Sequence, residues 1–109
     1  MRAAILSVLA ALGLLGCGQG SDEQVLFDGQ AFRGSASADS DDPRRFTAEV
    51  SPVSASLEGA RAAAEYEGIK YCVRQYGTSR IAWTIGPDAE AAALPLANDR
   101  LTLTGACRP

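Results

Sequence analysis

The sequence of 109 residues contains no histidine. Histidine is the commonest general base, the usual activator of a nucleophile and the commonest metal ligand. The chain also has no Cys-x-x-Cys pair, which is the usual redox motif. These absences count against most familiar catalytic centres, so we expect no cofactor, no metal and no enzymatic activity.

Aromatic residues are scarce, at 6 % of the chain, whereas apolar residues reach 47 % and many of them are alanine. This composition and length predict one domain with a small core. Without Arg2, which belongs to the leader described next, nine basic side chains stand against thirteen acidic ones. Only Arg44-Arg45 forms a basic pair, and nucleic-acid binding needs a larger basic surface. We therefore expect no nucleic-acid partner.

The first 16 residues have the parts of a secretory signal. A basic start, Met1-Arg2, is followed by an apolar run of about 13 residues, from Ala3 to Leu15, and by the small residue Gly16. The run is too short to span a bilayer core, which needs about 17–25 apolar residues. The pattern therefore predicts export.

The end of this leader, Leu14-Leu15-Gly16-Cys17, resembles the lipobox of bacterial lipoproteins, although leucine replaces the preferred small residue at position 15. The resemblance implies cleavage before Cys17 and attachment of a diacylglycerol, with acyl chains such as palmitate, to its thiol. Two or more chains make attachment stable, because each buried methylene contributes ~0.8 kcal/mol. An ordinary signal cleaved near Gly18 and an uncleaved apolar anchor remain as alternatives.

On this interpretation the chain has three parts: a signal peptide at 1–16, a lipidated N-terminus and flexible tether at 17–29, and a domain at 30–109. The domain would face the periplasm from the bacterial cell envelope. Gly18, rather than aspartate, follows the cysteine, which under enterobacterial sorting indicates the outer membrane.

The three cysteines fit the same interpretation, because lipidation of Cys17 leaves Cys72 and Cys107 as an even pair. An oxidising periplasm favours a disulfide between them. Closing that loop of about 36 residues contributes roughly 4 kcal/mol in the chain-entropy model. Two buried free thiols, or one reactive thiol, are the alternative. Two cysteines without histidine are too few ligands for zinc.

Alternation of polar and apolar residues predicts four strands, at residues 30–38, 46–50, 80–85 and 100–105. Between the second and third lies a helix from Ser56 to Tyr76, with Ser54 or Ser56 as N-cap and Gly77 as the stop. The order ββαββ predicts a small α+β fold in which one helix packs across one face of an antiparallel sheet.

The helix carries a stripe of apolar residues at 4-3-4-3 spacing, which predicts its buried face. The stripe comprises Ala62, Tyr66, Ile69, Val73 and Tyr76, and Cys72 borders it. We expect it to cover the inward residues of the sheet: Phe46, Val50, Ile81, Trp83, Leu101 and Leu103.

The sharpest charge cluster is Asp39, Asp41 and Asp42, which suggests either calcium coordination or a solvated hairpin loop. The loop is favoured, because the glycine and distal glutamate of an EF-hand are missing and Pro43 interrupts the spacing.

Asp88 and Glu90 are candidate paired carboxylates for glycoside chemistry, but they fall in a predicted loop without a cleft-building domain. Three tyrosines, Tyr66, Tyr71 and Tyr76, lie on the helix as either core residues or an aromatic interface.

The domain therefore resembles the small envelope lipoproteins of bacteria. We expect a membrane-anchored protein with a non-catalytic structural or protein-interaction role, which contacts the bilayer through acylated Cys17 and an envelope protein through its domain. The alternative is a small-ligand binding module, with a site between helix and sheet near Tyr76 and Trp83.

Overall fold

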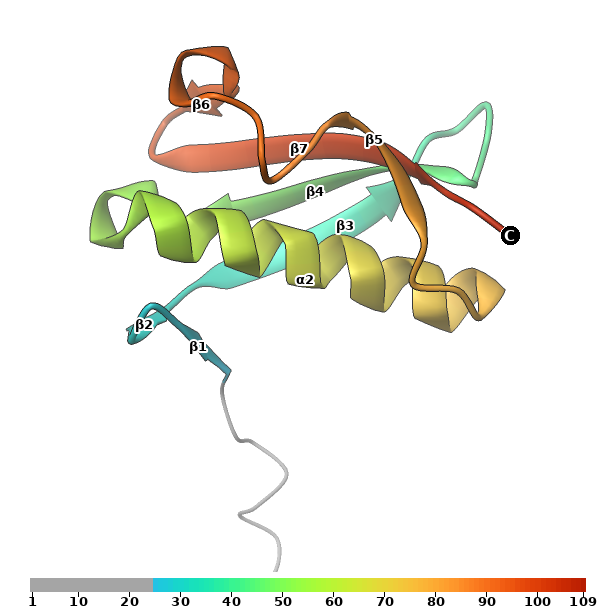
Figure 1. Ribbon diagram of the computed structural model, residues 1–109, viewed down its shortest axis with the longest axis horizontal. Helices are drawn as coiled ribbons and strands as arrows, with labels where there is room; N and C mark the ends of the chain where they lie inside the picture. The colour runs from blue at the N-terminus through green and yellow to red at the C-terminus, as the bar shows by residue number, and fades with distance from the viewer. Residues whose placement is uncertain (1–24) are drawn as a thin grey trace, which may run out of the picture.

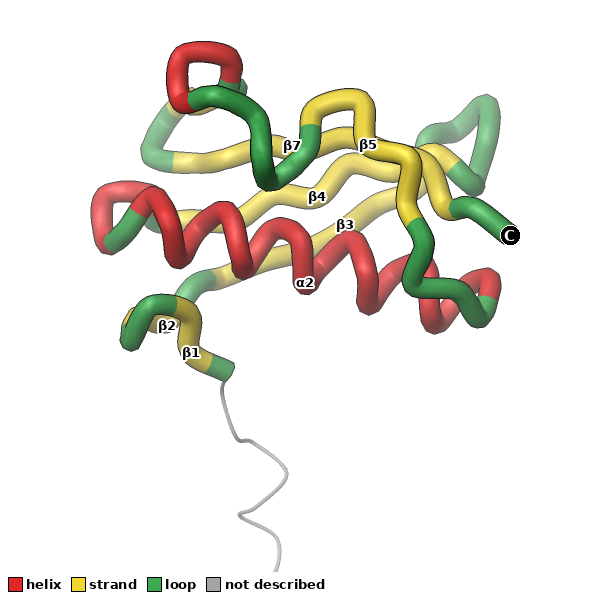
Figure 2. The backbone as a smooth tube through the Cα atoms, in the orientation of Figure 1, coloured by secondary structure: helices red, strands yellow, loops and turns green. Residues whose placement is uncertain are grey.

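The computed structural model describes residues 25–109, and the leader, Cys17 and residues 18–24 lie outside them. Within the described part the predicted α+β fold is confirmed. One long helix, α2 (Leu57–Tyr76), lies across one face of an antiparallel sheet, as Figures 1 and 2 show. None of the helices in residues 25–109 is both long and apolar enough to cross a membrane.

The sheet has five strands, and its path runs β3 (Arg33–Ala38), β4 (Arg45–Ser51), β7 (Arg100–Cys107) and β5 (Ile81–Ile85). The short β6 (Leu96–Ala97) pairs with the beginning of β7. All neighbouring strands are antiparallel. Because α2 comes between β4 and β5 along the chain, the order of the main elements is the predicted ββαββ.

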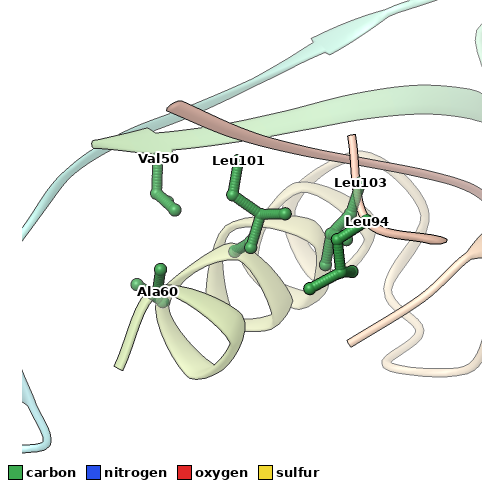
Figure 3. Close-up of a cluster of buried hydrophobic side chains, with 7 residues drawn as sticks. Val50, Ala60, Leu94, Leu101 and Leu103 are labelled. Carbon is green, nitrogen blue, oxygen red and sulfur yellow. The ribbon is translucent and has the colours of Figure 1, made fainter. Parts of the chain in front are cut away.

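Strands β4 and β7 alternate between a buried and a more exposed face, as the sequence predicts. Phe46, Ala48 and Val50 of β4 are buried, as are Leu101 and Leu103 of β7. Figure 3 shows side chains of this group between the sheet and α2. The residues between them carry mainly hydroxyl groups or charge and lie on the face away from the helix.

The ends of α2 also follow the sequence. Of the two candidate N-caps, Ser56 has the role, and its side chain accepts a hydrogen bond of 2.8 Å from the backbone N–H of Gly59. Gly77 ends the helix in the left-handed conformation with φ of 70°, which glycine adopts without steric cost.

The predicted buried face of α2 is wrong. The large residues Tyr66, Val73 and Tyr76 are 38 %, 48 % and 39 % exposed, and the buried positions are Gly59, Ala60, Ala63, Ala64, Gly68 and Cys72. Small residues bring the helix backbone close to the sheet. At Gly68, an added Cβ would lie 2.9 Å from ring atoms of both Phe46 and Trp83.

The folded part begins earlier than the predicted tether allows. Strands β1 (Leu26–Phe27) and β2 (Gln30–Ala31) form a hairpin through Asp28 and Gly29, both with positive φ, as a two-residue type I′ turn requires. Phe27 and Phe32 pack against the core. Phe32 also separates β2 from β3, so the predicted single strand 30–38 is two strands.

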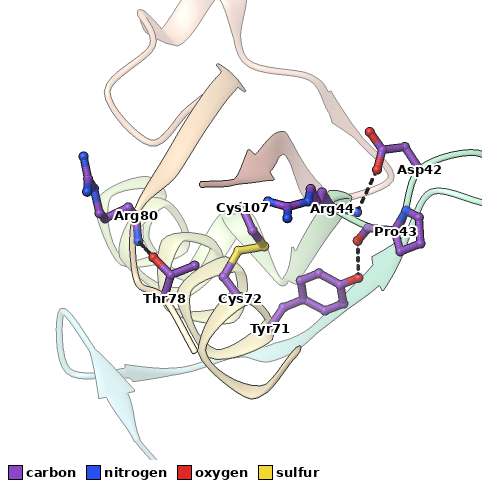
Figure 4. Close-up of a disulfide and its surroundings, with 8 residues drawn as sticks. All are labelled: Asp42, Pro43, Arg44, Tyr71, Cys72, Thr78, Arg80 and Cys107. Carbon is purple, nitrogen blue, oxygen red and sulfur yellow. Dashed lines mark hydrogen bonds between the residues drawn. A yellow bond between two sulfur atoms is a disulfide. The ribbon is translucent and has the colours of Figure 1, made fainter. Parts of the chain in front are cut away.

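Two other short elements complete the described chain. A 3₁₀ turn, η2 (Val53–Ala55), precedes α2, and a second, η3 (Ala91–Ala93), lies in an alanine-rich segment between β5 and β6. The predicted disulfide joins Cys72 of α2 to Cys107 of β7, with 5.5 Å between the two Cα atoms, as Figure 4 shows.

Candidate functional site

The two residues predicted to bind a ligand, Tyr76 and Trp83, have different surroundings in the structure. Trp83 packs edge-to-face on Phe46, with 5.5 Å between ring centroids, and lines a hollow of about 330 Å³ beneath the loop after β5. Tyr76 is not among the residues that line this hollow. It lies at the end of α2, where the guanidinium of Arg44 stands 5.3 Å from its ring centroid.

The other two helix tyrosines pack through their rings and join α2 to different parts of the chain. Tyr66 contacts Phe27 of the β1–β2 hairpin, and Lys70 lies 4.9 Å from the Tyr66 ring centroid. Tyr71 packs on Phe46 and donates a hydrogen bond of 2.6 Å from its hydroxyl to the carbonyl of Pro43. Burial raises the pKa of Tyr71, and the neighbouring Tyr76 adds to the increase.

The acidic loop between β3 and β4 uses its carboxylates to hold its own backbone. Asp39 Oδ1 accepts a hydrogen bond from the N–H of Asp41, and Asp42 Oδ1 accepts one from the N–H of Arg44. Such bonds are typical of Asx turns. Among residues 25–109, no group of three or more His, Cys, Asp or Glu side chains is placed to hold a metal ion.

The loop that carries Asp88 and Glu90 is attached to α2 by Arg61. The guanidinium of Arg61 donates to the carbonyls of Pro87 and Ala89, at 2.8 Å and 2.5 Å. Ala89 of the same loop also packs against the core cluster. Asp88 stands at the border of the hollow that Trp83 lines, and Glu90 is not among the lining residues.

Strand β3 is the first strand of the sheet path, and among residues 25–109 no strand pairs with its outer edge. The N–H of Asp39 donates to the carbonyl of Arg45, and that of Cys107 donates to the carbonyl of Arg44. Because hydrogen-bonded pairs alternate in an antiparallel ladder, odd-numbered residues of β4 bond to β3 and even-numbered residues bond to β7. It follows that the N–H and C=O groups of Gly34, Ala36 and Ala38 point outward from the edge.

The opposite edge of the sheet is built differently. Strand β5 carries a register shift between Trp83 and Ile85, and Pro87 follows it closely. Bulges and proline are devices that prevent another strand from adding to an edge. Strand β3 pairs with β4 without a shift over its whole length and contains no proline. Within the described chain, β3 is therefore the edge better suited to accept another strand.

A groove accompanies this edge between β3 and α2. It consists of two hollows, of about 400 Å³ and 240 Å³, that share Gly34, Glu67 and Lys70. At one end it is lined by Phe27, Phe32 and Tyr66, and at the other by Tyr71, Arg74 and Gln75. In the middle, Lys70 Nζ lies 3.3 Å from Glu67 Oε2. We call this feature the α2–β3 groove.

Sequence reasoning did not identify this edge. Alternation in residues 33–38 predicts a strand but does not say which strands become its neighbours, because pairing depends on contacts distant in sequence. Comparison with protein-family models, with curated proteins and with solved structures found no match. The features defined so far are those of a small disulfide-linked α+β domain with one open sheet edge.

Proposed function

We propose that this chain is a bacterial envelope lipoprotein, anchored through acylated Cys17, whose domain has a non-catalytic role and docks to protein through the free edge of β3 and the α2–β3 groove. The domain faces the periplasm, at the outer membrane. The observation that carries the docking role is the row of outward backbone groups along β3.

The cysteine pattern supports the anchor. Because Cys72 and Cys107 bond to each other, Cys17 is the one cysteine left for another role. A disulfide also fits a chain that folds in an oxidising compartment. The basic and apolar leader supplies the route to that compartment, and the lipobox-like segment places the acyl chains on Cys17.

The connection between the lipid and the domain is short. Eight residues lead from Cys17 to Val25, where the described chain begins. A fully extended chain of that length reaches about 28 Å, at ~3.5 Å per residue. Whatever its conformation, this connection keeps the β1–β2 hairpin close to the bilayer and confines the domain to the membrane surface.

The open edge supports a docking role. Extended segments add to exposed sheet edges through main-chain hydrogen bonds, while side-chain pockets beside the edge give specificity. Strand β3 offers the bonds, and the adjoining α2–β3 groove offers aromatic side chains at one end and charged ones along its middle.

Mass spectrometry of the native protein tests the anchor. We expect the mature chain to begin at Cys17, to carry a diacylglycerol mass and to sediment with membranes. A Cys17→Ser variant is expected to lose the acyl mass and keep its leader, whereas a Gln19→Ala variant, two residues further on, should behave as the parent. A soluble parent chain without acyl mass, or one cleaved elsewhere, would contradict the proposal.

A further inference from the structure

We propose that the partner of this edge is a second copy of the chain, and that two β3 strands pair antiparallel about a two-fold axis at Ala36. The proposal rests on the docking role of the preceding section and names its partner. It would join the two five-stranded sheets into one continuous sheet.

The backbone restricts the register of such a pair. The outward groups of Gly34, Ala36 and Ala38 must meet outward groups of the other copy. With the axis at Ala36, Gly34 lies opposite the partner's Ala38, and Ala36 lies opposite its own counterpart. Three hydrogen-bonded pairs then form six backbone hydrogen bonds. A shift of one residue would set outward groups against groups already bonded to β4, so the allowed registers differ by two residues.

Charge selects one of these registers. Arg33 begins β3, and Asp39 follows it directly, where the N–H of Asp39 still bonds to Arg45. With the axis at Ala36, each Arg33 lies opposite the partner's Asp39, which gives two symmetric pairs of opposite charge. A register two residues away would set Arg33 opposite the partner's Ser37, or Asp39 opposite the partner's Ser35.

The two charged side chains lie on the same face of the sheet. Arg33 lines a hollow with Glu49 and Arg100, and Asp39 lines one with Thr47 and Thr104, all on the face away from α2. In the proposed pair they occupy non-hydrogen-bonded positions, where facing Cα atoms are about 4.5 Å apart. Asp39 uses Oδ1 for its loop bond, and a carboxylate has a second oxygen to accept the guanidinium.

The helices leave room for this arrangement. Helix α2 contacts β3, β4 and β7, most extensively β4, so its axis lies near the middle of the three. Three strand spacings of ~4.8 Å would therefore separate the two helices by about 14 Å. This is more than the ~10 Å diameter of a helix with its side chains, so the helices do not clash.

The lipid anchor explains how a small interface suffices. Pairing of one short strand with its counterpart buries less than the ~1,000 Å² expected of a freestanding dimer. Anchoring both copies in one membrane raises their effective concentration, which converts weak contact into stable association. We therefore expect the pair to form on the membrane and to be weak in dilute solution.

Disulfide trapping in cells tests the register with the full-length chain. Ser35 and Ser37 of the two copies face each other, and both are exposed. A Ser35→Cys chain and a Ser37→Cys chain, with different C-terminal tags, are expected to form a mixed dimer on a non-reducing gel. A Thr84→Cys chain, altered at the opposite edge, should give at least about tenfold less dimer, as should the parent chain.

Charge exchange tests the two ion pairs. Arg33→Asp placed in both cysteine chains sets aspartate opposite aspartate and should reduce the mixed dimer about tenfold. Arg33→Asp in the Ser35→Cys chain combined with Asp39→Arg in the Ser37→Cys chain restores both opposite-charge pairs in the mixed dimer. Trapping should then return to within about twofold of the chains with native charges.

The outcomes separate this inference from the proposed anchor. The dimer would be overturned if the Ser35→Cys and Ser37→Cys chains form no mixed dimer while each still forms its Cys72–Cys107 bond. It would also be overturned if the charge exchanges leave the amount of mixed dimer unchanged. An acylated Cys17 in the same chains would then leave the anchor in place. Specific trapping with an unacylated Cys17 would instead support the dimer and contradict the anchor.

Discussion

The two halves of α2 are held to the sheet in different ways. In the first half, Ala60, Ala63 and Ala64 lie against Leu101 and Leu103 in an aliphatic cluster. In the second half, Cys72 belongs to a cluster with Phe46, Ala48 and Cys107, and aromatic rings surround it. The first half depends on side-chain volume supplied by the strands, and the second depends on a covalent bond.

The difference shows how a domain with few large residues forms a core. The helix contributes little side-chain volume to the core, because its buried face consists of glycine, alanine and one cysteine. These small residues instead let the helix backbone lie close to the sheet. Strands β4 and β7 contribute the volume. Four variants test this division, and each one affects a single half of the helix.

The largest effect is expected from removal of the disulfide. The Cys72→Ala/Cys107→Ala variant releases a loop with a sequence separation of 35 and should lose about 4 kcal/mol of unfolding free energy. Urea denaturation measures the loss, and hydrogen exchange should show it first in the second half of α2. Dithiothreitol should destabilise the parent and leave the variant unchanged; equal sensitivity of the two would contradict the expectation.

The first half of the helix should respond to Leu101→Ala. Leu101 is fully buried against the alanines of α2, so truncation leaves a cavity that costs about 3 kcal/mol, within the usual 2–5 kcal/mol. The matched control is Thr102→Ala, the next residue on the opposite face of β7, with an expected change below about 0.5 kcal/mol. Similar losses for both variants would refute the one-sided core.

Close approach of the helix is tested by Gly68→Ala. Alanine favours a helix by about 1 kcal/mol over glycine, but here the new methyl would press on the rings of Phe46 and Trp83. Overpacking costs about 1–3 kcal/mol, so we expect a net loss of about 1 kcal/mol in thermal denaturation. Gly34→Ala, which meets only the side chain of Glu67, should cost less, and a stabilised Gly68→Ala variant would disprove the close approach.

The smallest effect is expected at Tyr71, whose hydroxyl bonds to Pro43 beside the disulfide (Figure 4). Tyr71→Phe should cost about 1 kcal/mol or less at pH 7. The folded state raises the pKa of Tyr71, so its protonated form stabilises the protein below pH 10, the ordinary value for tyrosine. That stability is lost as the pH rises through the raised pKa. The Tyr71→Phe variant should therefore lose less stability than the parent above pH 10.

The strands and the helix whose apolar residues recur at a regular spacing were predictable from the sequence, and so was the disulfide. The alternation around Val50 and Leu103 identifies buried strand positions. The lipobox-like position of Cys17 sets this cysteine apart and leaves Cys72 and Cys107 as the predicted pair, which the structure shows bonded. The helix face was not predictable from hydrophobicity, because small and large apolar residues both recur at helical spacing. The stripe with Tyr66 and Val73 is the more apolar of the two. The helix backbone can approach the sheet only through the other face, which carries the small residues.

The position of β3 at the edge of the sheet was also not predictable from local sequence patterns. Residues 33–38 read as a strand, but only the whole topology shows that β4 has β7 on its other side and that β3 has one neighbour. The surroundings of the two residues predicted to bind a ligand also depend on contacts distant in sequence. Trp83 packs on Phe46 and lines the hollow after β5, whereas Tyr76 lies beside Arg44 at the end of α2.

The central place of β7 has a consequence for biogenesis. This strand comes last in the described order, yet β4, β5 and β6 all bond to it. A chain synthesised from its N-terminus can therefore pack α2 only against β3 and β4 until β7 has been made, because Leu101, Leu103 and Cys107 come later. The domain cannot complete its core before β7 has been made, and a product terminated before residue 100 should be degraded by proteases.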